Sequence, residues 1–353
     1  MLGAGGTIAP AIVRDLAESD EVSELLLLDL DAERALAVAE SHGGDKAFAL
    51  GVDAREGLSE AIEDSFVLVN SASYRVNVDA MRACLRAGCH YVDLGGLYHV
   101  TAQQLELHDE FERAGLLALL GMGSSPGKTN VMGVRALRDL DRTPERMDVI
   151  AASRDLDPPD GPSFPYAVQT LLDELTMAPM VVRDGEALEV GPLAPGGEID
   201  VGEPIGVADT IYTLHSEVLT FPDSFGCRAC SFRLSLAPAL LERLRALTGA
   251  PEPEVERAAR EALPPSARTV SVHVVTADEV RVTAVTEPME RWGLGGGIVS
   301  TAAPAAAAVR LLGRGRISAA GALPPERCVT PEDLFPELES RNCRFSVEVQ
   351  ALR

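Results

Sequence analysis

The sequence predicts an α/β protein with a Rossmann-type, doubly wound parallel sheet, followed by a second α+β domain whose sheet is mostly antiparallel or mixed. Three observations predict it. A glycine-rich turn opens the chain, strand-like and helix-like segments then alternate to about residue 120, and strand-like segments follow one another in the middle. Alternation of strand and helix is typical of a doubly wound parallel sheet, whereas consecutive strands indicate a meander of hairpins.

The glycine-rich turn has the first two glycines of a dinucleotide-binding loop. Gly3 permits the tight turn, and Gly5 lets a pyrophosphate approach the backbone above a helix N-terminus, where free N–H groups favour anions. Ile8 stands at the third glycine position, so looser packing of helix on strand is expected there. The residues expected to contact the cofactor here are Gly3, Gly5, Gly6, Thr7 and Ile8.

An acidic residue at the next strand end favours NAD over NADP as the cofactor. Leu25 to Leu28 are typical of a buried parallel strand that ends in Asp29. Asp29 lies near the position at which a carboxylate binds the ribose hydroxyls of a dinucleotide, and its negative charge would repel a 2′-phosphate there. The alternative is that Asp29 only ends the strand. Asp53, after the following strand, is expected either to reach the adenine or to cap the helix at 58–62.

The first strand is unusually short. A strand of about five residues is expected before the loop, but only Met1 and Leu2 precede Gly3. We therefore expect the native start to lie upstream.

Length and charge exclude several classes of function. The 353 residues suffice for two domains, and the net charge of −23 argues against binding of nucleic acid or of an anionic membrane. We identify no apolar run of 18 residues and no secretory leader, so a cytoplasmic protein without a membrane span is expected. The six cysteines are then expected to be reduced.

Cys227 and Cys230 form a lone CxxC pair. A zinc site needs a second pair of ligands, and none with suitable spacing is evident, so no metal is predicted. Two small residues at a turn into a strand are the favoured interpretation, with redox or metal chemistry as the alternative.

The elements expected from periodicity and turn signals divide the chain into three parts: a dinucleotide-binding domain at 1–127, an α+β substrate or dimerisation domain at 128–300, and a C-terminal segment at 301–353 that packs back on the first.

The same signals predict the individual elements. Helices are expected at 31–42, 58–62, 76–87, 101–114, 129–140, 166–177 and 302–312. Strands are expected at 25–29, 47–53, 66–70, 90–94, 116–120, 146–153, 180–190 (a hairpin around Asp184-Gly185) and 268–286 (a second hairpin). The glycines at 293–297 are interpreted as the approach to the last helix, capped by Ser300 or Thr301.

Four stretches resemble the saccharopine dehydrogenase / lysine 6-dehydrogenase family. They are Gly3 to Gly6 with Asp29, the run Val69 to Asn77 with Cys84 to Gly96, the run Gly121 to Asn130, and the segment from Gly321 through Leu338. The resemblance implies an NAD(P)-dependent oxidoreductase that acts on CH–NH or CH–NH2 donors, with lysine or a lysine-derived secondary amine as substrate. Ser125 stands where saccharopine-forming relatives usually carry Asp.

Polar residues at the expected carboxyl ends of the strands are the candidate site, because ligands of doubly wound folds bind there. Ser71 and Ala72 are expected near the cofactor ribose and nicotinamide. Asp93 is expected to meet the substrate ammonium or act as a base through water, with bracing of the adjacent glycine turn as the alternative. Tyr74 is a candidate proton donor or an interdomain packing residue. Lys128 is a candidate for binding a carboxylate, or is solvent-exposed, and His215, with Glu217, is a candidate for substrate contact or for a structural hydrogen bond.

Two other functions stay open: an imine reductase of the carboxynorspermidine or homospermidine type, and a non-catalytic NAD(H)-sensing binding module. A small-molecule amine or amino acid is the expected partner, and a homodimer formed through the sheet of the second domain is the expected assembly.

Overall fold

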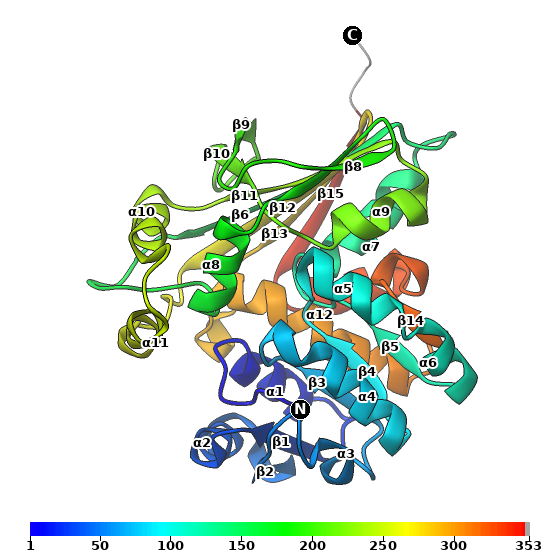
Figure 1. Cartoon of the computed structure of the whole chain (residues 1–353), viewed down its shortest axis with the longest axis vertical. Helices are drawn as coiled ribbons and strands as arrows, with labels where there is room; N and C mark the ends of the chain where they lie inside the picture. Colours follow the sequence, from blue (N-terminus) through cyan, green and yellow to red (C-terminus); the bar gives the residue numbers. More distant parts are fainter. Residues whose placement is uncertain (350–353) are drawn as a thin grey trace. The chain divides into compact units, whose positions relative to one another are not determined.

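The computed structural model describes residues 1–349, and the chain divides into two compact units (Figure 1). Unit 1 comprises Met1–Val131 and Thr301–Glu337, and unit 2 comprises Met132–Ser300 and, of the described residues, 338–349. The predicted boundary at 300/301 agrees, and the first boundary lies four residues later than predicted. The prediction that all of 301–353 packs on the first domain is wrong, because its last strand belongs to unit 2.

Unit 1 contains a parallel sheet interrupted near its centre. On one side β1 (Leu25–Asp29) pairs with β2 (Ala47–Gly51), and on the other the order is β14-β5-β4-β3. These strands are β3 (Val67–Asn70), β4 (His90–Asp93), β5 (Leu117–Leu119) and β14 (Gly321–Leu323). Leu2 bridges both parts, because its N–H donates to Val69 and it pairs in parallel with Leu28 and Asn70. Met1 and Leu2 therefore occupy the central strand position between β1 and β3.

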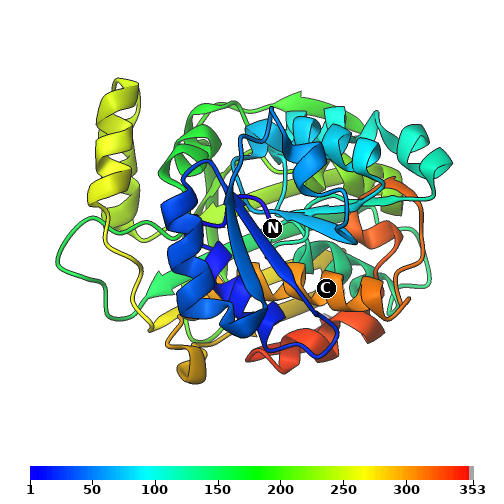
Figure 2. The ribbon, with the colours of Figure 1, turned by 90° about the horizontal axis from the view of Figure 1, so that it is seen from below.

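The helices of unit 1 follow the predicted alternation with one exception. Figure 2 shows α1 (Ala9–Ala17) and α2 (Ala32–His42) beside β1 and β2, and α2 is capped by Asp31 as predicted. The helix expected at 101–114 is in fact two, α5 (Leu97–Leu105) and α6 (His108–Ala114), because Leu107 turns inward, is buried and starts the second helix. The others are α3 (Leu58–Ala61) and α4 (Asn77–Ala87), which ends at Gly88 in the left-handed conformation, with the short helices η1 (Gly44–Lys46), η2 (Tyr74–Val76) and η4 (Pro325–Arg327).

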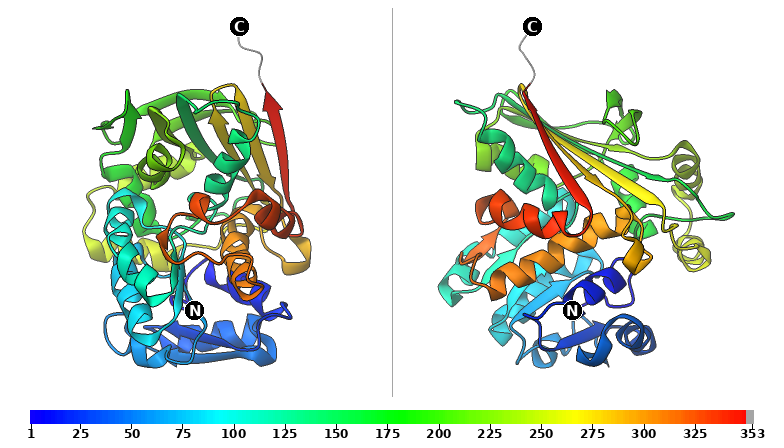
Figure 3. Two further views of the ribbon diagram at one scale, coloured as in Figure 1. Left: turned by 90° about the vertical axis from the view of Figure 1, so that its right-hand side faces the viewer. Right: turned by 180° about the vertical axis from the view of Figure 1, so that it is seen from behind.

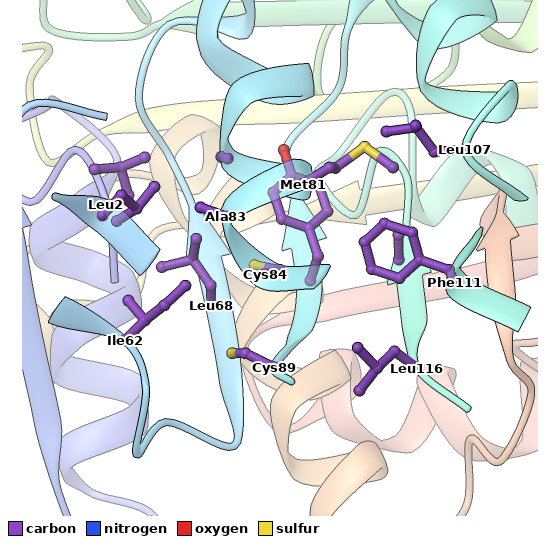
Figure 4. Close-up of a cluster of buried hydrophobic side chains, with 14 of the residues drawn as sticks. Leu2, Ile62, Leu68, Met81, Ala83, Cys84, Cys89, Leu107, Phe111 and Leu116 are labelled. Carbon is purple, nitrogen blue, oxygen red and sulfur yellow. The ribbon is translucent and has the colours of Figure 1, made fainter. Parts of the chain in front are cut away.

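The core of unit 1 lies between this sheet and its helices. Figure 4 shows Leu68, Met81 and Phe111 from β3, α4 and α6 in this core, and the buried Tyr91 belongs to the same cluster. A buried ion pair at 2.9 Å joins Asp15 of α1 to Arg310 of α12 (Gly296–Gly313). The helix that follows the glycine loop is thereby fixed by both apolar packing and charge.

Unit 2 contains a nine-stranded mixed sheet, which confirms the predicted α+β character. The order is β15-β13-β12-β6-β11-β10-β9, with β7 paired to β11 and to β8. Only β6 and β11 run parallel among these pairs. Figure 3 shows the edge strand β15 (Cys343–Val349) beside β13. The other bounds are β6 (Arg146–Asp155), β7 (Met180–Arg183), β8 (Glu186–Glu189), β9 (Pro195–Asp200), β10 (Val207–Tyr212), β11 (Ala229–Ser235), β12 (Thr269–Ala277) and β13 (Val280–Thr286).

Helices cover parts of this sheet, and three helices cross the boundary between the units, among them α12, which returns the chain to unit 1 at Thr301. The helices within unit 2 are α8 (Val168–Thr176), α9 (Glu217–Phe225), α10 (Pro238–Leu247), α11 (Glu252–Glu261) and η3 (Glu290–Trp292). The chain passes from unit 1 to unit 2 within α7 (Lys128–Leu137), as predicted for a helix at this position, and again within α13 (Pro331–Glu339).

The start of α12 differs from the prediction. The helix begins at Gly296, so neither Ser300 nor Thr301 is its cap. A Cβ on Gly296 would lie 2.9 Å from the carbonyl carbon of Thr286, and one on Gly295 would lie 2.7 Å from the Ser266 carbonyl oxygen. The glycine run therefore allows close packing on β12 and β13. Among the described residues, α12 is the one helix that is long and apolar enough to span a membrane, and 83% of this stretch is buried, as in the core helix of a folded domain.

Candidate functional site

The glycine loop lies against the end of β3. Gly3 has φ +76°, and a Cβ there would lie 2.6 Å from Cα of Ala72. The Ser71 hydroxyl donates to the carbonyls of Leu2 (3.0 Å) and Gly3 (3.2 Å). Ser71 and Ala72 therefore brace the loop from the side at which a dinucleotide would pass into the site.

The N-terminus of α1 has the features of a pyrophosphate site. Gly6 and Thr7 are exposed, the helix starts at Ala9, and its N-cap residue Ile8 supplies no side-chain hydrogen bond. The N–H groups of a first helical turn attract phosphate oxygens in this arrangement. Ile8, in place of the third glycine, is buried in the unit 1 core.

Asp29 and Arg34 flank the loop on the other side. The Asp29 carboxylate accepts the N–H of Gly5 at 2.8 Å and that of Asp31 at 3.0 Å, and Arg34 donates to the Gly5 carbonyl at 2.6 Å. These groups fit a nicotinamide dinucleotide. Backbone N–H groups would bind the pyrophosphate, and the Asp29 carboxylate and Arg34 guanidinium would lie at the ribose. Asp53 is exposed and accepts the N–H of Arg55, while Gly57 caps α3. The capping alternative for Asp53 is therefore wrong.

Asp93 is the centre of a buried hydrogen-bond network at the end of β4. One oxygen accepts Nδ2 of Asn77 (3.0 Å), the hydroxyl of Tyr91 (3.0 Å) and Nε2 of Gln104 (2.6 Å). The other accepts the N–H groups of Gly95 (3.0 Å) and Gly121 (2.6 Å). The side chain is 1% exposed, and burial raises its pKa although these hydrogen bonds oppose the shift.

This network supports the bracing role of Asp93. Five donors enclose the carboxylate that we expected to meet the substrate ammonium, so its oxygens are already hydrogen-bonded within unit 1. Asp93 ties the loop after β4 to the loop after β5 and to α4 and α5. It acts as a positioning residue in this arrangement.

Tyr74 and Lys128 follow the carboxyl ends of β3 and β5, which flank β4 in the same sheet. Tyr74 begins η2, directly after β3, and is half-buried with the Arg75 guanidinium 4.9 Å from its ring centre. Lys128 begins α7 and is 1% exposed, so the alternative of a solvent-exposed lysine is wrong.

The segment before Lys128 is held by side chains of unit 1. Asn130 accepts the N–H of Gly127 at 2.7 Å and donates to Glu326 at 2.7 Å. Pro126 fills the space beside Gly95 and Gly121, where a Cβ would approach its ring to 2.9 and 2.5 Å. The loops that end β4 and β5 are therefore packed together through one proline.

His215 lies in unit 2, with its ring stacked on Phe232 of β11 at 3.5 Å between centroids and 14° between planes. Its Nδ1 lies 3.3 Å from an oxygen of Glu217, the first residue of α9. Burial lowers the pKa of His215. The hydrogen bond to Glu217 and the negative charges of Glu217 and Glu174 raise it by more than burial lowers it, so the net shift of the pKa is upward.

The raised pKa of His215 predicts a pH-dependent contribution to stability. The folded state holds this proton more tightly than the unfolded chain, so the contribution is complete below the unfolded pKa of about 6.5 and is lost as pH rises through the folded value. The difference in free energy of unfolding between wild type and His215→Gln should therefore be largest at low pH, as measured by urea titrations from acidic to alkaline pH. A difference that is constant with pH would contradict this.

Cys227 and Cys230 are buried and unlinked, and each perturbs the pKa of the other through a hydrogen bond. Within residues 1–349, one group of three potential metal ligands lies close together, namely His108, Asp109 and Glu112 on the surface of α6.

Sequence reasoning missed Tyr91 and Gln104, which donate to Asp93, and Glu174, whose charge acts on His215. It also missed Tyr166, whose hydroxyl donates to Glu174. A signal existed for Tyr91, because it lies two residues before Asp93 in a strand and therefore shares its face. Glu174 and Gln104 lie within helices whose periodicity indicated only a polar position, and no local pattern identified their partners.

The first third of the chain is similar to a known family of domains. Residues 1–119 match the family model described as "Saccharopine dehydrogenase NADP binding domain". The matched stretch is similar to that domain and contains the glycine loop, Asp29 and Asp93.

Two relatives extend the comparison beyond this domain. The chain is 23% identical over 261 residues to carboxyaminopropylagmatine dehydrogenase of Synechocystis, an alignment that covers 70% of this chain but only 64% of that relative. The apo structure of saccharopine dehydrogenase (L-Glu forming) from Saccharomyces cerevisiae superposes with a TM-score of 0.71 at 14% identity and covers 99% of both chains. The second likeness shows that the fold is shared across both units.

Proposed function

We propose that this protein transfers a hydride between a nicotinamide dinucleotide and a C–N bond of an amino acid or amine, with lysine or a lysine-derived secondary amine as the first candidate substrate. The observation that carries the proposal is the combination, within unit 1, of the glycine loop with a buried polar assembly at the carboxyl ends of β3, β4 and β5. A bound nicotinamide supplies or accepts the hydride. The chain must hold the reacting carbon and move a proton at nitrogen.

The residues divide these tasks. Asp93 fixes the loops after β4 and β5 through its five hydrogen bonds. Tyr74 donates or accepts the proton at nitrogen, and Lys128 binds a substrate carboxylate. His215, with a raised pKa, is a further candidate to hold a cation or a proton. An amine must be neutral to release hydride, so a group that titrates near working pH is useful.

A second candidate is an imine reductase that joins an amine to a carbonyl partner. The similarity to carboxyaminopropylagmatine dehydrogenase of Synechocystis favours this alternative. The hydride step is the same, and only the source of the C=N bond differs. The two are distinguished by offering each amine alone with oxidised cofactor, and with a keto acid or aldehyde and reduced cofactor, while the absorbance of reduced nicotinamide is followed.

We further propose NAD as the preferred cofactor. Asp29 lies at the ribose edge of the loop, where its charge repels a 2′-phosphate, whereas Arg34 on the same edge would attract one. Asp29→Ala should lower the ratio of kcat/KM for NAD over NADP by about 10-fold or more, since one like-charge contact of this kind is worth about 1.4 kcal/mol. Steady-state kinetics with both cofactors measure this, and Asp31→Ala is the neighbouring control. An unchanged ratio would contradict the assignment.

The assembly that we propose is a homodimer formed through the sheet of unit 2, whose strand order ends at the edges β15 and β9. Light scattering of the full chain at several concentrations tests it, and a monomeric mass throughout would contradict it. A cytoplasmic location stays a prediction.

A further inference from the structure

Unit 2 contains two cysteines that take no part in the proposed reaction. Cys227 lies in the turn after α9, and Cys230 is the second residue of β11. Both are free thiols, the residues are 3% and 2% exposed, and a hydrogen bond joins their side chains. Thiols in hydrogen-bond contact are near enough to be joined by a disulfide without a large movement of the backbone.

The backbone on both sides of the pair is fixed. The N–H groups of Arg228 and Ala229 donate to the carbonyl of Glu145, at 3.0 and 2.9 Å. Cys230 belongs to β11, which is hydrogen-bonded to β6 and β7. The turn therefore holds the Cys227 thiol against that of Cys230 in the folded unit.

The two thiols are not equivalent. A hydrogen bond from Cys230 to the thiolate of Cys227 lowers the pKa of Cys227, whereas the same contact, together with burial, raises the pKa of Cys230. Cys227 also lies between Gly226 and Arg228, which are both exposed. Because the thiolate is the nucleophile of a cysteine, Cys227 is the residue that attacks first, and Cys230 reacts second.

The surroundings of the pair do not suit a metal ion. Among residues 1–349, the one group of three potential ligands whose atoms all lie within 4.8 Å of one another is His108, Asp109 and Glu112. Neither cysteine belongs to that group, and a structural zinc ion takes four ligands. The chemistry left to the pair is exchange with another disulfide.

A disulfide at this place would act on the start of α9. In the dithiol form, the Cys230 thiol donates to the carbonyl oxygen of Glu217, the first residue of that helix, at 3.9 Å. A disulfide has no S–H group, so this weak hydrogen bond is lost when it forms. The side chain of Glu217 bonds His215, and the His215 ring stacks on Phe232, which shares a face of β11 with Cys230. The oxidation state of the pair therefore affects the segment that holds His215.

We propose that Cys227 and Cys230 form a site of thiol–disulfide exchange, whose reaction partner is a small disulfide such as oxidised glutathione and whose oxidation loosens the start of α9. The Cys227 thiolate attacks one sulfur of that disulfide, and one glutathione thiol leaves with the proton that Cys227 gave up. The Cys230 thiolate then attacks Cys227 in the mixed disulfide, and the second glutathione thiol leaves with the proton of Cys230. The protein loses two electrons and two protons, the glutathione disulfide gains them, and no other oxidant is needed. This inference does not depend on the hydride transfer proposed above.

The test treats the full-length protein with oxidised and reduced glutathione at a series of ratios, followed by alkylation, intact mass and peptide mapping. Wild type should form a Cys227–Cys230 disulfide that dithiothreitol reverses. Cys230→Ser should instead retain one glutathione on Cys227, because the second step is missing. Cys227→Ser should react at least about 10-fold more slowly, since it lacks the attacking thiolate. Cys328→Ser, which removes a partly buried thiol of unit 1, is the matched control and should behave as wild type.

Two results would overturn the inference. The first is a wild-type pair that stays open to alkylation even in fully oxidised glutathione, and this result decides the question where a serine variant does not fold. The second concerns α9, where amide hydrogen exchange at residues 217–221 should be faster in the oxidised than in the reduced protein. An equal rate of exchange in the two forms would show that the disulfide does not act on this helix.

Discussion

Asp93→Ala is expected to destabilise unit 1 by about 3–5 kcal/mol. The substitution leaves five donors without their acceptor, from Asn77, Tyr91, Gln104, Gly95 and Gly121, in a region closed to water. Urea unfolding followed by circular dichroism measures this. Glu63→Ala, which removes an exposed acid from the same unit, should change stability by less than about 0.5 kcal/mol.

Asp93→Asn refines the same expectation. The amide keeps the shape but replaces an acceptor by a donor and removes the charge, so a smaller loss of stability is expected. Because the pKa of Asp93 is raised in the folded state, ionisation costs stability as pH rises from the unfolded value of about 4 through the folded one. The wild-type advantage over Asp93→Asn should shrink across that range. Normal stability with abolished turnover would instead identify Asp93 as a catalytic residue.

Gly3→Ala is expected to weaken dinucleotide binding on the order of 100-fold and to destabilise the fold. The added Cβ would meet the backbone of Ala72, and φ +76° is unfavourable for any other residue. Moving Ser71 and Ala72 aside displaces the loop that receives the pyrophosphate. Fluorescence titration with NADH measures the binding.

A matched control separates backbone strain from collision. Gly44 also has positive φ (+57°), but a Cβ there meets nothing within 4 Å. Gly44→Ala should therefore cost only the strain, about 1–2 kcal/mol, and leave NADH binding unchanged. Equal effects of the two substitutions would contradict the role given to the contact between Gly3 and Ala72.

The fold was predictable where local signals coincide. The run Leu25 to Asp29 is a strand because its leucines are buried by the parallel sheet, and the Asp184-Gly185 hairpin forms because both residues take positive φ. The break at Leu107 and the early start of α12 were missed. Each depends on a tertiary contact. Leu107 packs into the unit 1 core, and the first residues of α12 pack against Thr269 and Thr286.

The candidate site was predictable in its residue types but not in their surroundings. The place of Asp93 at the carboxyl end of the strand predicted at 90–94 singled it out, yet nothing local showed that Gln104, eleven residues later, would enclose it. His215 was identified from its neighbour Glu217, whereas Glu174 and Tyr166 reach the same place from α8 and its preceding loop. Partners brought together by tertiary packing leave no periodic signal.

The measurement that tests the central claim most directly is turnover by the full-length protein, followed through the absorbance of reduced nicotinamide with a panel of amines in both directions. The panel contains lysine, saccharopine, ornithine, agmatine and diamines, with and without keto-acid or aldehyde partners. Cofactor-dependent oxidation or reduction of at least one C–N bond, reduced by at least about 10-fold in Tyr74→Phe or Lys128→Met, is the predicted result. Tight NADH binding without turnover of any member would contradict it and would favour a non-catalytic NAD(H)-sensing module.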